Sequence, residues 1–421
     1  MKPKILLLFF LSISSYTFAQ INYPAPTGVY CSCPPTSVAG SISVIPNVAS
    51  LPFVKGVLVR VGWSDLEPSD NIFNWYLIDQ QITAANSYVK KISLAIGCGP
   101  QTPQWIFSIG VQYVTEPTTH PPYIDSIALP WDSIFISKWT SLIDSLGRRY
   151  KNDTTITLVY MTNSTQNGNE MQLPPTPTPS WVSVGYADLK VINSWKTIID
   201  AFSASFPNHY LTNDFHPVNN SNAVADSVFA FANNLIPARY GASAWWWSQN
   251  NTTVYPAQDS ILSGSAINNP FTGIQMVKSG TIDSATFGAG GMPAALQLAI
   301  DNKICYWEIW NEDIVNSNFT TLLSNASCNT TGIDVPLIQN NQVTVYPNPF
   351  SLQTTIEADE VFKNATLTVC NLFGQNVKQM KNISGQTIIL FRDNLPDGLY
   401  FFKLTEGEKI FKTDKLVITN N

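Results

Sequence analysis

The feature that most constrains the fold is a regular alternation of strand-like and helix-like runs between residues 25 and 314. Short runs rich in Val, Ile and aromatic residues are bounded by Gly, Pro and Asn, as buried strands are. Between most of them lie longer stretches with apolar residues three or four positions apart, which predict amphipathic helices. The strand-like runs cover residues 28–33, 56–63, 91–97, 156–163, 209–214, 239–247, 272–278 and 305–310.

Strands that alternate with helices in this way fit a closed (β/α)8 barrel, an α/β fold with a parallel sheet. The predicted helices cover residues 76–89, 132–150, 186–206 and 292–302. An open doubly wound sheet is the alternative. It leads one to expect a Gly-rich phosphate turn after the first strand, and the sequence has none there. We therefore predict a TIM barrel in residues 20–314.

Residues 343–421 have a different character, with four short strand-like runs separated by Gly, Asp and Asn. That spacing predicts a small all-β sandwich. A polar stretch without clear periodicity, residues 315–342, precedes these runs and is predicted to be a linker. The strand-like runs are 366–372, 386–391, 398–404 and 415–419.

Four motifs follow one another in this tail: VYPNPF (345–350), NLFGQNV (371–377), LPDGLYFFKL (395–404) and KLVI (415–418). Over its full length the segment resembles the C-terminal sorting domain of type IX secretion in Bacteroidetes. The resemblance implies that the type IX secretion machinery is a partner. It also implies export across the outer membrane, with the domain removed or exchanged for a surface anchor.

The N-terminus has the pattern of a secretory signal peptide. Lys2 and Lys4 precede an apolar run at 5–11, and small and polar residues follow as far as Ala19. We expect a signal peptide at residues 1–19, with cleavage after Ala19. The apolar run is shorter than the ~20 residues of a membrane span, and no later segment meets that length, so we predict no transmembrane segment. The expected location is secreted or on the outer cell surface, reached through the periplasm and the outer membrane.

Charge, histidine content and cysteine spacing bear on which macromolecules, metals and cofactors the chain could bind. Charged residues are 12% of the chain and the net charge is −6 without a basic cluster, so nucleic acid and anionic membranes are poor candidate partners, and we predict no nucleic-acid binding. With three histidines and irregularly spaced cysteines, we predict no metal centre and no cofactor. Cys31, Cys98 and Cys305 fall on predicted strands, and both buried thiols and disulfides remain open for them.

A second resemblance lies in the barrel region. The segments VRVGWSDLEPSDNIFNWYLIDQQI (59–82) and KISLAIGCGPQTPQWI (91–106) resemble the second and third strand units of retaining glycoside hydrolases of the large (β/α)8 clan, especially its β-galactosidase-like branch. It covers these segments well and the rest of the barrel in outline. The resemblance implies hydrolysis of O-glycosidic bonds in a poly- or oligosaccharide by two carboxyl groups. We interpret Glu67 as a structural loop acid and expect Arg60 to hold an inward carboxylate.

In this clan the proton donor is the Glu of an Asn-Glu pair after the fourth strand. Here Asn169 and Glu170 follow that strand, so the resemblance implies that Glu170 is the general acid/base. The intervening residues STQNG push the pair outward, which leaves a solvated loop acid as the alternative. The clan's nucleophile is a Glu that ends the seventh strand, and this strand offers Gln275 and no acid.

The string YWEIWNED forms the eighth predicted strand and its end. Strand alternation places Tyr306, Glu308, Trp310 and Glu312 on one face. Because a carboxylate between two aromatic residues is costly to bury without a partner, we predict Glu308 as the second catalytic carboxylate. Glu312 is the alternative, and an ion pair between Glu308 and Arg60 is the structural alternative.

Substrate contacts are expected where strands end at the C-terminal face of the barrel. Aromatic rings suit the apolar faces of sugars, while amides and carboxylates suit their hydroxyl groups. In the run Trp245–Trp247 at least one indole should face the barrel mouth, and Asn213 and His216 are further hydrogen-bonding candidates. The predicted substrate-binding residues are Trp63, Trp105, Asn163, Asp214, Trp246, Gln249 and Trp310.

Three functions follow from these patterns. The first is a secreted glycosidase that uses Glu170 and Glu308. The second is a non-catalytic surface carbohydrate-binding protein on a degenerate glycosidase barrel, which the missing acid on the seventh strand favours. The third is an adhesion or structural protein, which would lack an aromatic-lined cleft.

Overall fold

The structure, a computed structural model, describes residues 23–33, 46–117, 124–173, 178–327, 343–371, 375–407 and 409–420. It divides into two compact units, Met1–Asn329 and Thr330–Asn421. The predicted signal peptide lies outside the described residues. In the described part of the chain, no helix has both the length and the apolar character that crossing a bilayer requires.

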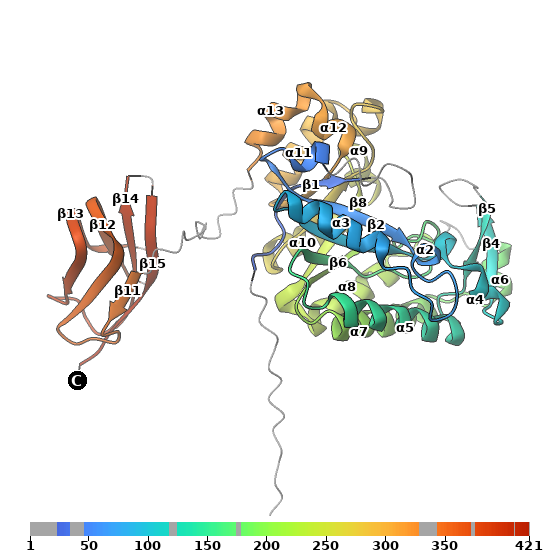
Figure 1. Cartoon of the computed structure of the whole chain (residues 1–421), viewed down its shortest axis with the longest axis horizontal. Coiled ribbons are helices and arrows are strands. Elements are labelled where there is room, and N and C mark those ends of the chain that lie inside the picture. The colour runs from blue at the N-terminus through green and yellow to red at the C-terminus, as the bar shows by residue number, and fades with distance from the viewer. Residues whose placement is uncertain are drawn as a thin grey trace, which may run out of the picture. The chain divides into compact units, whose positions relative to one another are not determined.

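The first unit contains a closed barrel of parallel strands in the order β1-β10-β9-β8-β7-β6-β3-β2, which confirms the predicted TIM barrel (Figure 1). The strand order follows the chain around the barrel, as right-handed βαβ units require. The strands are β1 (Gly28–Ser32), β2 (Val54–Gly62), β3 (Lys91–Gly97), β6 (Ile156–Tyr160), β7 (Tyr210–Asp214), β8 (Tyr240–Trp247), β9 (Gly273–Met276) and β10 (Tyr306–Trp310).

Helices cover the outside of this barrel, and the predicted ones correspond to α3, α5, α7 and α11. The remaining helices, among them the 13-residue α8 and α10, were not predicted. The helices are α2 (Trp63–Leu66), α3 (Tyr76–Ser87), α4 (Gln104–Ser108), α5 (Ser133–Tyr150), α6 (Pro179–Ser183), α7 (Asp188–Ser205), α8 (Ala223–Leu235), α9 (Gln249–Val254), α10 (Pro256–Asn268), α11 (Gly291–Asp301), α12 (Asn311–Val315) and α13 (Ser317–Asn325), with 3₁₀ turns η1 (Gly99–Gln101), η2 (Pro237–Arg239) and η3 (Ser284–Phe287).

Helix α5 shows how the sequence sets these elements. Asp132 caps its N-terminus by accepting from the backbone N–H groups of Ile134 and Phe135, and two arginines lie in its last turn, where the helix dipole favours cations. Its apolar face is buried. A Cβ at Gly147 would come within 2.5 Å of the backbone oxygen of Ser205, so glycine lets α5 and α7 approach closely.

Two packed regions follow from the alternation along the strands. Tyr306 belongs to an aromatic cluster with residues from β1, β2, β3, β6, β7 and β8, whereas Trp307 and Ile309 belong to the large core that contains the residues of the outer helices. The alternation predicted for the eighth strand is therefore present within β10, but it does not extend to Glu312, which lies on helix α12. The cluster consists of Tyr30, Leu58, Ala95, Leu158, Tyr160, Tyr210, Trp245, Phe271 and Tyr306.

A two-stranded antiparallel hairpin, β4 (Tyr113–Pro117) with β5 (Ile124–Ala128), follows the third barrel strand and was not predicted from the sequence. Helix α13 belongs to the first unit, and its Leu323 is buried in the core of that unit. The first unit therefore extends past residue 314, where the linker was predicted to begin.

The second unit is built from antiparallel strands, in agreement with the predicted all-β tail. The sheet order is β11-β12-β14-β15, and β13 pairs with β12. Its apolar residues, among them Ile356, Leu367 and Phe402, form a separate core. The strands are β11 (Val343–Tyr346), β12 (Gln353–Cys370), β13 (Asn376–Phe391), β14 (Gly398–Glu406) and β15 (Lys409–Ile418).

The cysteines differ in state. Cys31, Cys33 and Cys98 are buried free thiols, and Cys370 is a partly exposed free thiol. Cys305 is disulfide-bonded. Both possibilities that the sequence left open, thiols and disulfides, are therefore realised among the strand cysteines.

A matched pair of leucines tests the barrel's packing. We expect Leu142→Ala, at a fully buried position of α5, to lower the free energy of unfolding by about 2–5 kcal/mol because it leaves a cavity. Leu189→Ala, at a position of α7 that is 65% exposed, should change it by less than about 0.5 kcal/mol. Urea unfolding followed by tryptophan fluorescence measures both values. All 12 tryptophans precede residue 311, so the signal reports on the first unit. Equal losses in both variants would contradict the packing.

Candidate functional site

A cavity of about 510 Å3 lies at the C-terminal mouth of the barrel. Its lining comes from the ends of strands β2, β8, β9 and β10 and from the loops that follow β3 and β6. This is the face where a parallel barrel presents its loops. The lining residues are Arg60, Gln101, Asn167, Asn169, Glu170, Gln172, Trp245, Gln275, Val277, Lys278 and Trp310.

Two indole rings and one guanidinium group shape this cavity. The Cζ atom of Arg60 lies 5.9 Å from the ring centroid of Trp245 and 5.4 Å from that of Trp310. Both distances are within the range of cation–π attraction, about 6 Å. Arg60 Nη2 also donates to the backbone oxygen of Cys33 at 2.7 Å, and Trp310 Nε1 donates to that of Met276 at 2.6 Å. These contacts hold the rings and the cation in place.

Glu170 is the one carboxylate among the described residues that line this cavity. Its side chain is 21% exposed, so it is largely buried and not a solvated loop acid. Its backbone N–H donates to Asn167 Oδ1 at 2.9 Å, and Gln172 Nε2 donates to its Oε2 at 2.6 Å. Burial raises the pKa of Glu170 above its ordinary value, although the facing His216 lowers it.

The loop that carries Glu170 is pinned to the end of β3. Cys98 N donates to Gly168 O at 2.9 Å. Gly168 has φ +85°, and a Cβ there would come within 1.7 Å of the backbone oxygen of Cys98. Only glycine fits this position. The residues STQNG, which separate Glu170 from its strand in the sequence, therefore form a tight return that brings Glu170 back to the mouth.

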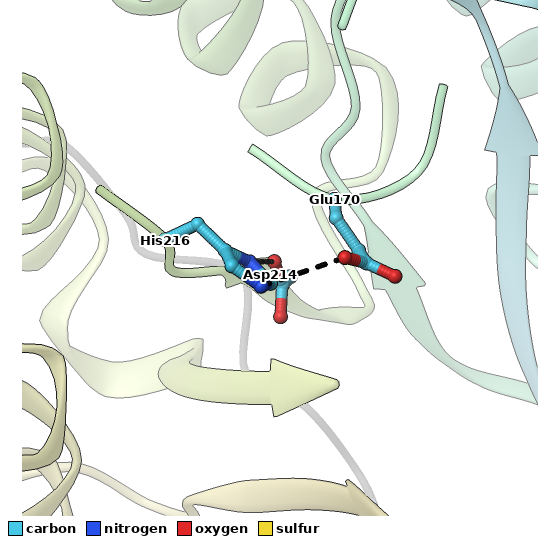
Figure 2. Close-up of side chains that lie close together, drawn as sticks. All are labelled: Glu170, Asp214 and His216. Atoms are coloured by element: carbon cyan, nitrogen blue, oxygen red, sulfur yellow. Dashed lines mark hydrogen bonds and ion pairs between the residues drawn. The ribbon is translucent and has the colours of Figure 1, made fainter. Parts of the chain in front are cut away.

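Glu170 is the first of a row of three titratable side chains, followed by His216 and Asp214 (Figure 2). His216 Nδ1 is 2.6 Å from Asp214 Oδ2, and His216 Nε2 is 3.5 Å from Glu170 Oε2. Asp214 also accepts from the backbone N–H of Trp245 at 2.6 Å, which fixes it at the end of β7. Burial lowers the pKa of His216, but Asp214 and Glu170 raise it, and the net direction is upward.

The same three residues offer ligand atoms that all lie within 4.8 Å of one another. Glu, Asp and His are suitable donors for a divalent cation. However, Nδ1 of His216 is engaged by Asp214, so Nε2 and Glu170 alone remain on the cavity side, fewer protein ligands than zinc sites have. We therefore interpret the row as a support for Glu170, in which the hydrogen bond between His216 and Asp214 holds His216 Nε2 at 3.5 Å from the Glu170 carboxylate.

Glu308 lies below the cavity and is fully buried. Its Oε1 accepts from the hydroxyl groups of Tyr160, at 2.8 Å, and Tyr306, and its Oε2 accepts from Gln275 Nε2 at 2.8 Å. Burial raises its pKa to about 7, against the lowering effect of these donors and of Arg60. Gln275 also lines the cavity, so its side chain lies between Glu308 and the cavity.

The structure brings together only part of the predicted site. Of the predicted residues, Glu170 and Trp310 line the cavity, and Asp214 supports Glu170 from behind. Of the tryptophan run, Trp245 is the residue in the lining. The residues that do not line the cavity are Trp63, Trp105, Asn163, Trp246, Gln249, Glu308 and Glu312.

These residues have other partners. Trp63 is fully buried against Phe135 and Trp139 and donates to Glu67 Oε2 at 2.8 Å. Trp105 donates to the backbone oxygen of Glu67 at 2.9 Å.

Buried partners also hold Asn163 and Trp246. Asn163 donates to Ser194 Oγ at 3.1 Å, and Trp246 donates to Phe215 O at 2.7 Å. Gln249 begins α9, and Glu312 lies on α12.

Several lining residues were missed by the sequence analysis. Gln101, Asn167, Asn169 and Gln172 give the cavity side-chain amides, and Lys278 gives it a second cation. Their signal was the density of Asn and Gln in the stretches after the third and fourth strands, which also occurs in many surface loops.

A second hollow, of about 710 Å3, lies beside the β4–β5 hairpin and α6. Its lining residues are Gly110, Val111, Gln112, Tyr113, Ser183, Val184 and Gly185, and none of them is acidic or basic. The barrel mouth, which has aromatic walls and charged groups, is therefore the candidate site.

Comparison with known proteins identifies the tail. Residues 344–419 match the family model of the secretion system C-terminal sorting domain, which confirms the assignment made from four sequence motifs. No curated protein matches the chain in sequence.

The structural neighbours are glycoside hydrolases. The tri-modular endo-β-1,4-glucanase B from Bacillus halodurans has 9% identity and a TM-score of 0.48, over 93% of this chain and 77% of that one. An exo-β-1,4-mannosidase from Opitutaceae bacterium strain TAV5 has 12% identity and a TM-score of 0.42, over 68% of this chain and 52% of that one. The catalytic domain of the major endoglucanase from Xanthomonas campestris pv. campestris has 12% identity and a TM-score of 0.43, over 70% of this chain and 88% of that one.

The pH dependence of stability tests the placement of Glu308. Its pKa is higher in the folded protein, about 7, than its ordinary value of 4.5, so between these values the folded state holds a proton that the unfolded state has lost. Stability therefore falls as the pH rises through this window, by about 3 kcal/mol from this group. Glu308→Gln should remove that part of the slope in urea unfolding across the window. A variant with the wild-type slope would contradict the buried position.

Proposed function

We propose that the barrel is a carbohydrate-binding module that holds a poly- or oligosaccharide in the cavity at its mouth. The observation that carries this proposal is the pair of indole walls, Trp245 and Trp310, around a cavity in which five of the eleven lining residues carry side-chain amides. A sugar ring has apolar C–H faces that suit an indole, and hydroxyl groups around its edge that suit amide and guanidinium groups. The side chains of Gln101, Asn167 and Arg60 provide such groups.

The arrangement of carboxylates favours binding over hydrolysis. Hydrolysis of a glycosidic bond by a carboxylate pair requires one group on each side of the bond. Glu170 lines the cavity, whereas both oxygens of Glu308 are engaged below it by Tyr160, Tyr306 and Gln275. Gln275, on the seventh barrel strand, is an amide and cannot act as a nucleophile. The function supported best is therefore a carbohydrate-binding protein on a glycosidase-like barrel.

A glycosidase is the second candidate, and the environment of Glu170 favours it. A general acid must keep its proton near neutral pH, and the pKa of Glu170 is raised by burial. Glu170 would regain its proton from the water that enters the reaction, and His216, held by Asp214, lies 3.5 Å from Glu170 Oε2 and would orient that carboxyl group. In this candidate Glu308 is the second carboxylate, and Gln275 must move aside before Glu308 can reach a substrate.

The sorting domain indicates where in or around the cell this binding would occur. A tail recognised by the type IX secretion machinery directs the chain out of the cell, in keeping with an origin in Bacteroidetes and with the predicted signal peptide. The mature barrel would then meet polysaccharides outside the outer membrane, in solution or at the cell surface.

Tryptophan variants test the binding proposal. In native gels that contain a panel of polysaccharides, we expect at least one polymer to retard the wild-type protein. Trp245→Ala and Trp310→Ala should weaken this binding about tenfold or more, because each removes a central aromatic contact. Trp105→Ala is the matched control, since this indole is partly exposed but lies outside the cavity lining. Retardation by no polymer, or an equal loss in the control, would contradict the proposal.

Hydrolysis is tested on the same proteins with nitrophenyl glycosides and the retarding polysaccharide. The binding proposal predicts no cleavage by the wild type, and unchanged retardation of the Glu308→Gln variant. The glycosidase candidate predicts cleavage that falls about 10²–10⁴-fold in Glu170→Gln, the usual contribution of a general acid. Cleavage lost in both carboxylate variants would replace the binding proposal by the glycosidase.

A further inference from the structure

Two thiols face each other at the end of the first barrel strand. Cys31 lies on β1 and Cys33 directly follows it, and both side chains are buried. Their Sγ atoms are 3.1 Å apart. This is closer than the roughly 3.5–4.0 Å at which non-bonded heavy atoms usually pack. Among the described cysteines that are free, Cys98 has Thr102 Oγ1 as its neighbour, at 3.7 Å.

The backbone explains the approach. In a straight strand, the side chains of residues two apart point to the same side, but their Cα atoms are separated by about 6.5 Å along the strand. Here the N–H of Cys33 donates to the carbonyl oxygen of Cys31 at 3.1 Å, the hydrogen bond of a three-residue γ-turn. This turn closes the spacing between the two residues toward the range in which cysteines are bridged. A covalent bond requires the sulfur atoms to move together by about 1 Å more.

We propose that Cys31 and Cys33 form a disulfide bond in the exported protein, a modification site at the edge of the carbohydrate cavity. The proposal is independent of whether the barrel binds or cleaves a sugar. Disulfides form in the compartments that exported proteins cross, and Cys305 shows that this chain carries one elsewhere.

The bond forms by exchange with a disulfide donor, such as a disulfide oxidoreductase or oxidised glutathione. The thiolate of one cysteine attacks the donor and releases one donor thiolate, which leaves a mixed disulfide on the protein. The second cysteine thiolate then attacks the protein sulfur of that mixed disulfide and releases the other donor thiolate. The two released thiolates take up the two protons. The cysteine pair is oxidised and the donor is reduced to two thiols.

We expect this thiol–disulfide exchange to take place while the chain is folding, before the two cysteines are buried. Burial raises the pKa of the Cys31 thiol well above its ordinary value, and the nearby Cys33 raises it further. The thiolate is the nucleophile, so the folded protein with reduced thiols reacts slowly. During export the strand end is still exposed, and the turn then brings the sulfurs together as the barrel closes.

The bond would act on the cavity through Arg60. The carbonyl oxygen of Cys33 accepts from Arg60 Nη2 at 2.7 Å, and the same guanidinium lies over the rings of Trp245 and Trp310. A bridge between Cys31 and Cys33 fixes the position of that carbonyl at the end of β1. The disulfide thus stabilises the cationic wall of the cavity.

Thiol trapping of the full chain tests the proposal. The protein is exported into an oxidising compartment, purified without reductant, and denatured in excess N-ethylmaleimide before digestion and mass spectrometry. We expect the peptide that carries Cys31 and Cys33 to be unlabelled and about 2 Da lighter than its dithiol form, the mass of two hydrogen atoms. Cys98 should carry the label and serves as the internal control. Two labels on the Cys31–Cys33 peptide, or a bond from either residue to another cysteine, would overturn the proposal.

Refolding provides a second measurement that does not depend on the export host. The reduced, denatured chain is refolded with reduced and oxidised glutathione, and the same peptide is followed over time. The bridged peptide should appear, and Cys33→Ser should instead hold a glutathione adduct on Cys31, because the second attack is then missing. Cys98→Ser should bridge at the wild-type rate. Refolding to the native tryptophan fluorescence with both thiols still reduced would also refute the assignment.

Discussion

Closure of the barrel between its first and last strands is the interaction on which the rest of this molecule depends. β1 and β10 pair in parallel register, with Tyr30 opposite Glu308 and Ser32 opposite Trp310. The pairing joins segments that lie more than 270 residues apart in the chain. Because of it, Arg60 from the neighbouring β2 lies over Trp310, and the Cys31–Cys33 turn lies beside the cavity. The Arg60–Trp310 wall of the candidate site and the cysteine turn therefore lie along this junction of the first and last strands.

The closed barrel buries the carboxylate of Glu308 in its interior. A buried carboxylate is unfavourable unless polar partners surround it. Glu308 has two tyrosine hydroxyls and one amide as donors, and Tyr306 continues the network to Ser93 at 2.6 Å. The network spans strands β3, β6, β9 and β10, so it specifies how these strands are arranged around the barrel. The same donors occupy the oxygens that a reacting sugar would need.

Much of the fold could be predicted because periodicity is a local property. The eight strands, four of the helices and the all-β tail each follow from the spacing of apolar residues within one segment. The sorting domain was recognisable because its motifs follow one another in a fixed order. The hairpin β4–β5 and helix α13 are short elements, and packing against the rest of the first unit decides their structure.

The site was less predictable because it depends on contacts between distant segments. Trp63 resembled a mouth residue, but it opens helix α2 directly after β2, so strand alternation does not govern its direction. The direction of Glu308 was predictable, yet its accessibility depends on Tyr160, which is 148 residues away. The loop of Glu170 looked like an outward insertion, because nothing in its own sequence shows that Cys98 holds Gly168. Residue type and spacing predicted which segments lie at the C-terminal mouth of the barrel. Which of their side chains line the cavity depends on packing between distant segments.

The backbone contact of Gly168, beside Glu170, bears on which residues of this loop can vary in related proteins. Its anchor is made by main-chain atoms, the Cys98 amide and the Gly168 carbonyl, so the anchor does not depend on the side chains at either flank. Asn169 and Gln172 can therefore be exchanged for other residues while the loop keeps its path, whereas Asn167 Oδ1 accepts from the backbone N–H groups of Asn169 and Glu170 and helps to hold that path. The loop could then carry different linings at the mouth, so relatives with this loop path should share Gly168 and differ at the positions that follow it.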